Sequence, residues 1–174
     1  MISYYDDDCF LQCHGKKICV NGRYFLDFRA KKVVDYMSES LNMVNSFLGR
    51  MHLAIHLELL NEEQFALVQE GIRYYNRIAS AKKNALPYFP NGFTHFGAEN
   101  VAAGFVLGAT IYLAVWCLQG DSRVVVPLGG EIADYSLTYP SESETVYKVE
   151  SGKLIVHFAR VGSTAFFELS SKTV

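Results

Sequence analysis

The sequence predicts an α+β protein in which helices come first and an antiparallel β-sandwich of the Greek-key type follows. Two observations carry this prediction. From Phe28 to residue 83 apolar residues recur every three or four positions, the period of an amphipathic helix. From residue 91 they fall instead in short runs separated by glycine turns. Pro87 and Pro90 mark the change, because proline cannot continue a helix. We therefore expect a helical segment, 1–90, and a β-sandwich domain, 91–174.

The composition narrows the class of protein. Half of the 174 residues are hydrophobic and the net charge is −2, so a core can form and no basic surface for nucleic acid is expected. No apolar run reaches the roughly 18 residues of a membrane span. The start, MISYYDDDCF, is acidic where a signal peptide is basic. We expect a cytoplasmic protein that binds neither nucleic acid nor membrane.

The first helix is predicted to follow an irregular or extended start, 1–26, that includes a strand-like run at 23–26. Asp27 is a suitable cap for a helix beginning at Phe28. Asn45 and Gly49 weaken the middle of this helix, and a break is expected there. Its apolar stripe consists of Val34, Met37, Leu41, Val44, Leu48, Met51 and Ile55.

The second helix has a clear start at Asn61. Gln64 stands three residues later, so the two side chains can form a capping box, and Leu60 and Phe65 can pack across the helix start. Lys82 and Lys83 suit its C-terminal end. The buried stripe is expected to consist of Phe65, Val68, Ile72, Tyr75 and Ala79.

The strands of the second half are predicted from their flanking turns. Gly108, Gly120, Pro140, Gly152 and Gly162 each lie between two β-rich runs. The predicted strands cover residues 100–106, 110–118, 123–128, 135–139, 145–149, 154–158 and 164–169.

Several stretches in order resemble one family. LGRMHLAIHLELLNEEQFALVQEGIRYYNRI (48–78) looks like the last helical part of the barrel in bacterial α-galactosidases of glycoside hydrolase family 36. ALPYFPNG (85–92) resembles the link that follows the barrel. ENVAAGFVLGATIYLAVWCL (99–118), DYSLTYPS (134–141) and SGKLIVHFARVGSTAFFEL (151–169) are similar to the closing β-domain. The resemblance covers residues 46–169.

The N-terminal stretch resembles an earlier part of the same barrel. LQCHGKKICVNGRYFLDFRAKKVVDYMSESLNMV (11–44) is similar to the segment just before the catalytic nucleophile. The resemblance implies that the intervening barrel is missing, with the join near residues 44–46. Two or three helices and one strand cannot close a barrel. The helical segment is therefore expected to be the remnant of a (β/α)8 barrel.

The resemblance implies an enzyme that hydrolyses α-galactoside oligosaccharides with retention of configuration and without metal or organic cofactor. Retention needs two carboxylates, and in the family both come from the missing part. No catalytic, cofactor-binding or metal-binding residue is therefore carried over, and this chain alone is expected to be inactive. Helices without their barrel are expected to expose apolar faces and to self-associate through them.

Three other groups of residues have side chains suited to a site. Cys9, Cys13, His14 and Cys19 have zinc-binding side chains without the paired spacing of strong zinc motifs. His52 and His56 are four residues apart on a helix, but Leu53 stands where a zinc protease has glutamate. Among carboxylates, the first to test are Asp27, Asp134, Glu142 and Glu144.

The aromatic residues of the strands leave one question open. Tyr112, Ala114 and Trp116 share one face of a strand, while Leu113, Val115 and Cys117 share the other. One face is core, and an outward one could stack on a sugar together with Tyr139.

Two further hypotheses stand beside the glycosidase. One is a non-catalytic β-sandwich module that binds a protein partner or carbohydrate. The other is a small metal protein built on the cysteines at 9–19.

Overall fold

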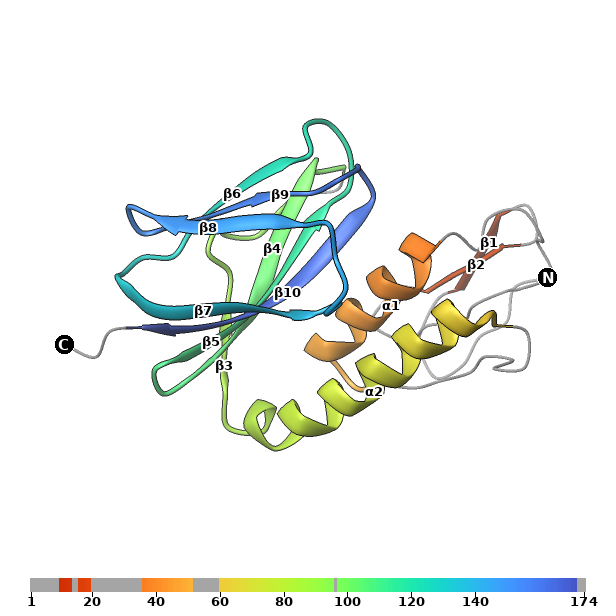
Figure 1. The fold of residues 1–174 in the computed structure, drawn as a ribbon, viewed down its shortest axis with the longest axis horizontal. Helices are drawn as coiled ribbons and strands as arrows, with labels where there is room; N and C mark the ends of the chain where they lie inside the picture. Colours follow the sequence, from red (N-terminus) through yellow and green to blue (C-terminus); the bar gives the residue numbers. More distant parts are fainter. Residues whose placement is uncertain (1–9, 14–15, 20–35, 52–59, 96, 172–174) are drawn as a thin grey trace.

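The computed structural model describes residues 10–13, 16–19, 36–51, 60–95 and 97–171. Two helices, α1 (Tyr36–Leu48) and α2 (Glu62–Lys82), lie beside antiparallel sheets (Figure 1). A separate hairpin pairs β1 (Phe10–Cys13) with β2 (Lys16–Cys19). The expected cap at Asp27, the strand-like run at 23–26 and the residues 52–59 lie outside the described residues. The remaining strands are β3 (Leu86–Tyr88), β4 (Asn100–Leu107), β5 (Thr110–Cys117), β6 (Arg123–Pro127), β7 (Ile132–Tyr139), β8 (Val146–Glu150), β9 (Lys153–His157) and β10 (Ser163–Ser171).

Two sheets follow the helices. The larger has the order β3-β4-β5-β10-β7 and the smaller the order β6-β9-β8, with every neighbouring pair antiparallel. The chain changes sheet between β5 and β6, β6 and β7, β7 and β8, and β9 and β10. The predicted antiparallel α+β class is confirmed, and the two sheets stack in a sandwich-like arrangement (Figure 1).

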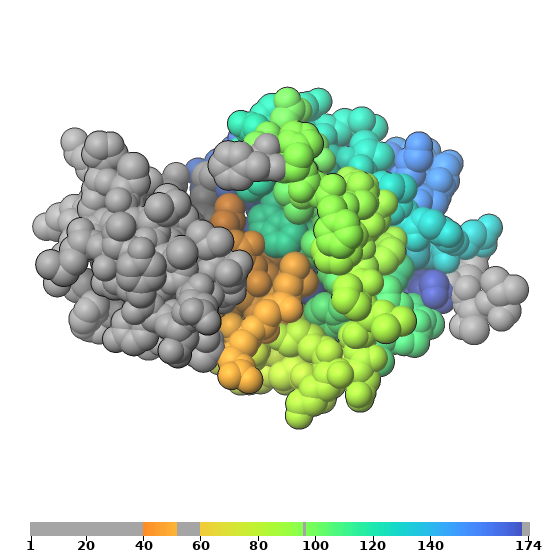
Figure 2. Space-filling view, turned by 180° about the vertical axis from the view of Figure 1, so that it is seen from behind, coloured from red at the N-terminus to blue at the C-terminus, as the bar shows by residue number. Residues whose placement is uncertain are grey.

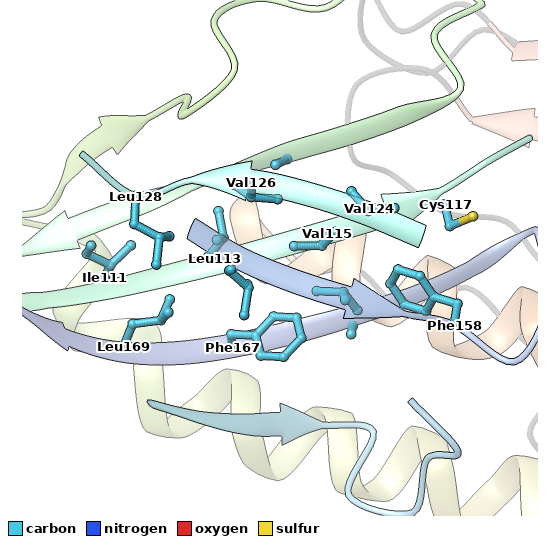
Figure 3. Packing of buried hydrophobic residues seen from close by; sticks show 14 residues of the cluster. Ile111, Leu113, Val115, Cys117, Val124, Val126, Leu128, Phe158, Phe167 and Leu169 are labelled. Carbon is cyan, nitrogen blue, oxygen red and sulfur yellow. The ribbon is translucent and has the colours of Figure 1, made fainter. Parts of the chain in front are cut away.

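One buried cluster fills the space between the two sheets. It is almost wholly aliphatic, and β5, β6, β9 and β10 all contribute to it (Figure 3). Its buried members are Ala102, Ile111, Leu113, Val115, Cys117, Val124, Val126, Leu128, Leu154, Val156, Phe158, Ala165, Phe167 and Leu169. We call this set the inter-sheet cluster.

A second cluster lies on the other face of the larger sheet, against the helices. It is rich in aromatic rings, and its buried members are Met43, Val44, Phe47, Leu67, Val68, Tyr74, Ile78, Ala103, Phe105, Ala114, Trp116, Tyr139 and Phe166. We call this set the helix-facing cluster. The question about β5 is thereby answered, because its alternate residues point into two different cores and both faces are covered.

The helix α2 begins as predicted, but a different face is buried. Gln64 N–H donates to Asn61 Oδ1 over 2.8 Å and Asn61 N–H donates to Gln64 Oε1 over 3.0 Å, which confirms the capping box. The predicted stripe lies about one residue further along the helix than the buried face, and its first member, Phe65, is 39% exposed. The buried face instead consists of Gln64, Leu67, Val68, Gly71, Tyr74 and Ile78. This face follows from contact with α1, because a Cβ on Gly71 would meet the Met43 side chain.

The helix α1 ends where a break was expected. Gly49 N–H donates to Ser46 O over 3.3 Å, just beyond the last helical residue, Leu48. Its predicted stripe missed Phe47, which is fully buried against the rings of Tyr74, Tyr139 and Phe166. The buried residue is Phe47 and not the predicted Leu48 that follows it, because the sheet and α2 pack against the side of α1 that carries Phe47.

The strand boundaries agree with prediction to within a few residues, but β3 was not expected to be a strand. Its residues pair with β4, Leu86 opposite Val106 and Pro87 opposite Phe105. A strand at a sheet edge tolerates proline because one side of its backbone needs no partner. Since β3 pairs only with β4, it forms an outer edge of the larger sheet.

Candidate functional site

A polar cleft of about 490 Å³ is the best candidate for a binding site in the described part of the chain. Four parts of the chain meet there: the loop between β7 and β8, the loop between β9 and β10, the first residues of β10 and one residue of α1. The lining residues are Ser40, Pro140, Glu142, Ser143, Glu144, Thr145, Ala159, Arg160, Ser163 and Thr164. It therefore combines carboxylates, a guanidinium group and hydroxyls on one surface.

The β7–β8 loop is held in place by contacts with α2. Ser141 N–H donates to Glu70 Oε1 over 2.7 Å, and the buried Tyr139 hydroxyl donates to Leu67 O over 3.3 Å. Within the loop, Ser143 Oγ donates to Thr145 Oγ1 over 2.7 Å. The position of the loop thus depends on the packing of the helix against the sheet, which sequence reasoning could not supply.

The candidate carboxylates are only partly brought together. Glu142 and Glu144 both line the cleft and both are exposed. Asp134 is exposed near the opposite end of β7, and its carboxylate accepts from the Tyr135 N–H. Roughly 17 Å of extended strand separates Asp134 from Tyr139, where the cleft begins. Asp134 is therefore no part of this cleft, and Asp27 lies outside the described residues.

A second depression adjoins the cleft and shares Glu142 with it. It has a volume of about 600 Å³ and runs along the first turns of α2. Its charged residues are Glu62, Glu63, Glu70, Arg73 and Glu142. The excess of carboxylates makes this face of α2 acidic.

The aromatic residues considered for sugar stacking are mostly core. Tyr139 is fully buried and Trp116 is 7% exposed, both within the helix-facing cluster. Tyr112 is half-buried and stacks on Phe105, with 4.7 Å between ring centroids. Trp116 Nε1 is a buried donor without a hydrogen-bond partner. Neither Trp116 nor Tyr139 presents a ring face to a ligand from solvent.

Among the residues that the structure describes, no group of three or more His, Cys, Asp or Glu side chains is placed to hold a metal ion. Cys13 pairs with Lys16 and Cys19 with Phe10, so the two cysteines lie at opposite ends of the β1–β2 hairpin. Cys9, His14, His52 and His56 lie outside the described residues. Cys117 is a buried free thiol, and its burial raises its pKa.

One polar contact that the sequence did not predict fixes α2 to the sheet. The Tyr74 hydroxyl donates to Glu168 Oε1 over 2.9 Å, and the same oxygen accepts from the Arg77 guanidinium, which also lies over the Tyr74 ring. Burial raises the pKa of Tyr74. Because Glu168 is on β10 and 91 residues from Arg77 along the chain, no local pattern could have joined them. This contact is structural.

Several cleft residues were also not anticipated, namely Arg160, Ser163 and Ser40. The only sequence feature near Arg160 and Ser163 that could have indicated a loop was the predicted turn at 161–162. Arg160 and Ser163 lie near Glu142 because the chain crosses between the two sheets, and Ser40 lies there because α1 packs on the larger sheet.

Solved structures include chains similar to this one. No family model matches the chain, and no curated protein matches it. Among solved structures, the galactosidase domain of an α-galactosidase–sucrose kinase, AgaSK, is similar with a TM-score of 0.58 and 14% sequence identity. The match covers 86% of this chain and 21% of that one, so the chain spans about a fifth of that structure. At this identity the similarity is one of fold: the chain has a galactosidase-related fold.

The helices of the described residues differ from membrane-spanning helices in their combination of length and hydrophobicity. Neither α1 nor α2 is long and apolar enough to cross a membrane.

Proposed function

We propose that this chain is a non-catalytic part of a glycoside hydrolase of the α-galactosidase type. In this proposal α1 and α2 derive from the end of a (β/α)8 barrel, and residues 91–174 are the β-domain that closes the family fold. The observation that carries it is the fold similarity to the AgaSK galactosidase domain over 86% of the chain. The helix-facing cluster supports the proposal, because residues of α1, α2 and the larger sheet form this one cluster.

An intact enzyme of this family would hydrolyse α-galactoside oligosaccharides without a cofactor. A retaining glycosidase places two carboxylates about 5 Å apart around the scissile bond. Here Glu142 and Glu144 line the cleft from a loop whose side chains are exposed to solvent, whereas a closed active site excludes water from its reacting groups. This environment does not suit an acid/base pair, so the chain alone is inactive in this proposal.

Release of p-nitrophenol from an aryl α-galactoside by the purified, folded chain tests this directly. We expect no turnover above a heat-denatured control. Turnover that persists through repurification and disappears in Glu142→Gln or Glu144→Gln would overturn the proposal. The matched control is Glu150→Gln, because Glu150 is exposed on β8 and does not line the cleft.

A second candidate function is weak carbohydrate binding in the cleft. The observation favouring it is the combination of carboxylates, the Arg160 guanidinium and hydroxyls, all of which hydrogen-bond to sugar hydroxyls. Trp116, the only tryptophan of the chain, stands opposite the cleft residue Thr164 in the sheet register. Saturable change of its fluorescence on titration with melibiose, lost in Arg160→Gln and kept in Glu150→Gln, would support this function. No change in fluorescence or in calorimetric heat would exclude it.

A cytoplasmic location and self-association remain proposals. The described apolar faces of α1 and α2 are largely covered by the sheet and by each other, which directs attention to other surfaces for association.

A further inference from the structure

The cleft and the depression beside it form one acidic surface. They adjoin and share Glu142, and we call the two together the acidic hollow. Five carboxylates line it against two guanidinium groups, which leaves three negative charges, whereas the whole chain has a net charge of −2. The hollow therefore carries more net negative charge than the chain as a whole. Its carboxylates are those of Glu62, Glu63, Glu70, Glu142 and Glu144, and its guanidinium groups those of Arg73 and Arg160.

This charge is local and not spread evenly over the surface. Figure 2 shows residues 84–95, in green, at the surface of the molecule, and this stretch contains no Asp, Glu, Lys or Arg. Charges of one sign that gather around a concave surface attract ligands of the opposite sign and raise their local concentration. The acidic hollow is thus suited to a positively charged ligand.

Three of its carboxylates have no partner in the described part of the chain. Glu62, Glu63 and Glu144 are exposed and make no hydrogen bond or ion pair there. Glu70 accepts from the Ser141 N–H, which is a neutral donor. The positive end of the α2 dipole offsets only about half a charge. Negative charge therefore remains for a ligand to neutralise.

The positions of the carboxylates do not suit a single metal ion. Among the described residues, no three of them are grouped closely enough to hold one. Glu62 and Glu70 are eight residues apart on α2, which is roughly 12 Å along the helix axis, and Glu144 lies on the β7–β8 loop. The cationic groups of a matching ligand must be separated in the same way.

The other lining groups favour a ligand that is rich in hydroxyls. Ser143, Thr145 and Ser163 bring hydroxyl groups to the cleft, and a hydroxyl both donates and accepts. The two parts of the hollow measure about 490 and 600 Å³, each within the range of small-molecule sites. A chain of linked units that carries hydroxyls and spaced ammonium groups matches both the lining and the charge.

We propose that the acidic hollow binds an oligosaccharide of amino sugars whose amines are free and protonated. This inference rests on the proposed carbohydrate-binding function of the cleft and names its ligand class. The ammonium groups pair with carboxylates of the cleft and of α2, and the sugar hydroxyls bond to the serine and threonine hydroxyls. Each exposed ion pair strengthens binding about 1.5- to 5-fold, so three pairs strengthen it on the order of tenfold.

Isothermal titration calorimetry of the full chain with two matched tetrasaccharides tests the proposal. One is the β-linked tetramer of glucosamine, and the other is its fully N-acetylated form, which has the same backbone without the ammonium groups. At about pH 6, where a free amine is protonated, and roughly 20 mM salt, we expect at least about tenfold tighter binding of the amine form. At roughly 300 mM salt the difference should shrink, because salt screens exposed charges.

Substitutions in both parts of the hollow locate the contact. Glu144→Gln, and Glu62→Gln combined with Glu63→Gln, should each weaken binding of the amine form by about 2- to 5-fold and leave binding of the acetylated form unchanged. The matched control is Glu150→Gln, because Glu150 is exposed on β8 and lines neither part of the hollow. An equal loss in this control would overturn the proposal.

Three further results would also overturn it. Equal affinity for the two tetrasaccharides would do so while leaving carbohydrate binding in place. Tetralysine has four side-chain ammonium groups and no sugar hydroxyls, so binding as tight as that of the amine form would make the ligand a basic peptide instead. No heat with either tetrasaccharide or with melibiose would overturn both this proposal and the carbohydrate-binding function.

Discussion

The two faces of the larger sheet are buried in different ways. The inter-sheet cluster is mostly aliphatic and is closed by strands from both sheets. The helix-facing cluster is built around Phe47, Tyr74, Tyr139 and Phe166, whose rings contact one another. It also includes polar contacts from Tyr74 to Glu168 and from Tyr139 to Leu67.

This difference teaches how the helices are attached. Aliphatic side chains from two sheets interdigitate without directional contacts. Ring pairs and buried hydrogen bonds have preferred geometries, so they fix the orientation of a helix on a sheet. We therefore expect the helices to be an integral part of the fold, although the sequence predicted a helical segment, 1–90, apart from a β-sandwich domain, 91–174.

The largest expected effect comes from truncating one ring in each cluster. Phe47→Ala and Phe167→Ala should each lower the free energy of unfolding by about 3–5 kcal/mol, because both side chains are fully buried. Urea unfolding followed by both far-ultraviolet circular dichroism and Trp116 fluorescence should give one coincident transition. If Phe47→Ala melts the helical signal alone, the two faces are separate folding units. Phe65→Ala is the control and should cost about 1 kcal/mol or less.

A smaller loss of stability is expected from adding one methyl group to a strand of the larger sheet, at Gly104, or to α2, at Gly71. In Gly104→Ala the new Cβ would lie 1.9 Å from the backbone oxygen of Tyr112, whereas in Gly71→Ala it would meet the flexible Met43 side chain. We expect a loss of about 3 kcal/mol at Gly104 and of about 1–2 kcal/mol at Gly71. Thermal melts of both variants check this order. A reversed order would mean that the helix interface is the more rigid of the two.

The polar contact of the helix-facing cluster predicts a dependence on alkaline pH. Burial raises the pKa of Tyr74 above its ordinary value of 10.0, so the folded state keeps a proton that the unfolded state loses. This contribution to stability is complete below about pH 10 and is lost as pH rises above it. Urea unfolding between pH 8 and 11 should show a smaller loss in Tyr74→Phe than in the wild type. Tyr88 and Tyr112, whose pKa values burial also raises, leave a residual slope. Equal slopes would contradict the prediction.

The smallest effect should come from the start of α2. Asn61→Ala removes the side-chain half of the capping box and should cost about 1 kcal/mol. Chemical denaturation measures it, and Asn76→Ala on the exposed face of α2 is the control. A loss no greater than that of the control would mean that tertiary packing alone holds this helix end.

The candidate site shows the limits of sequence reasoning most clearly. Glu142 and Glu144 could be named as a pair because they are neighbours in the chain. Arg160 and Ser40 could not be added to them, because they reach the cleft through strand crossings and through α1 packing on the sheet. The same holds for Glu168 and Arg77, which no local pattern links.

The sequence alone determined both described helices and the strands from β4 to β10, with strand ends to within a few residues, but it did not predict the β1–β2 hairpin or β3. Glycine and proline turns set the strands, Asn61 and Gln64 set the start of α2, and Gly49 ended α1, because these signals act through the local backbone. Only the tertiary structure decided which side of each helix is buried. On α2 the predicted stripe, which begins at Phe65, is offset by one residue from the observed buried face, which includes Leu67, Gly71 and Tyr74. Both stripes have helical period, so the choice rests on contacts with α1 and the sheet, which come from distant parts of the chain.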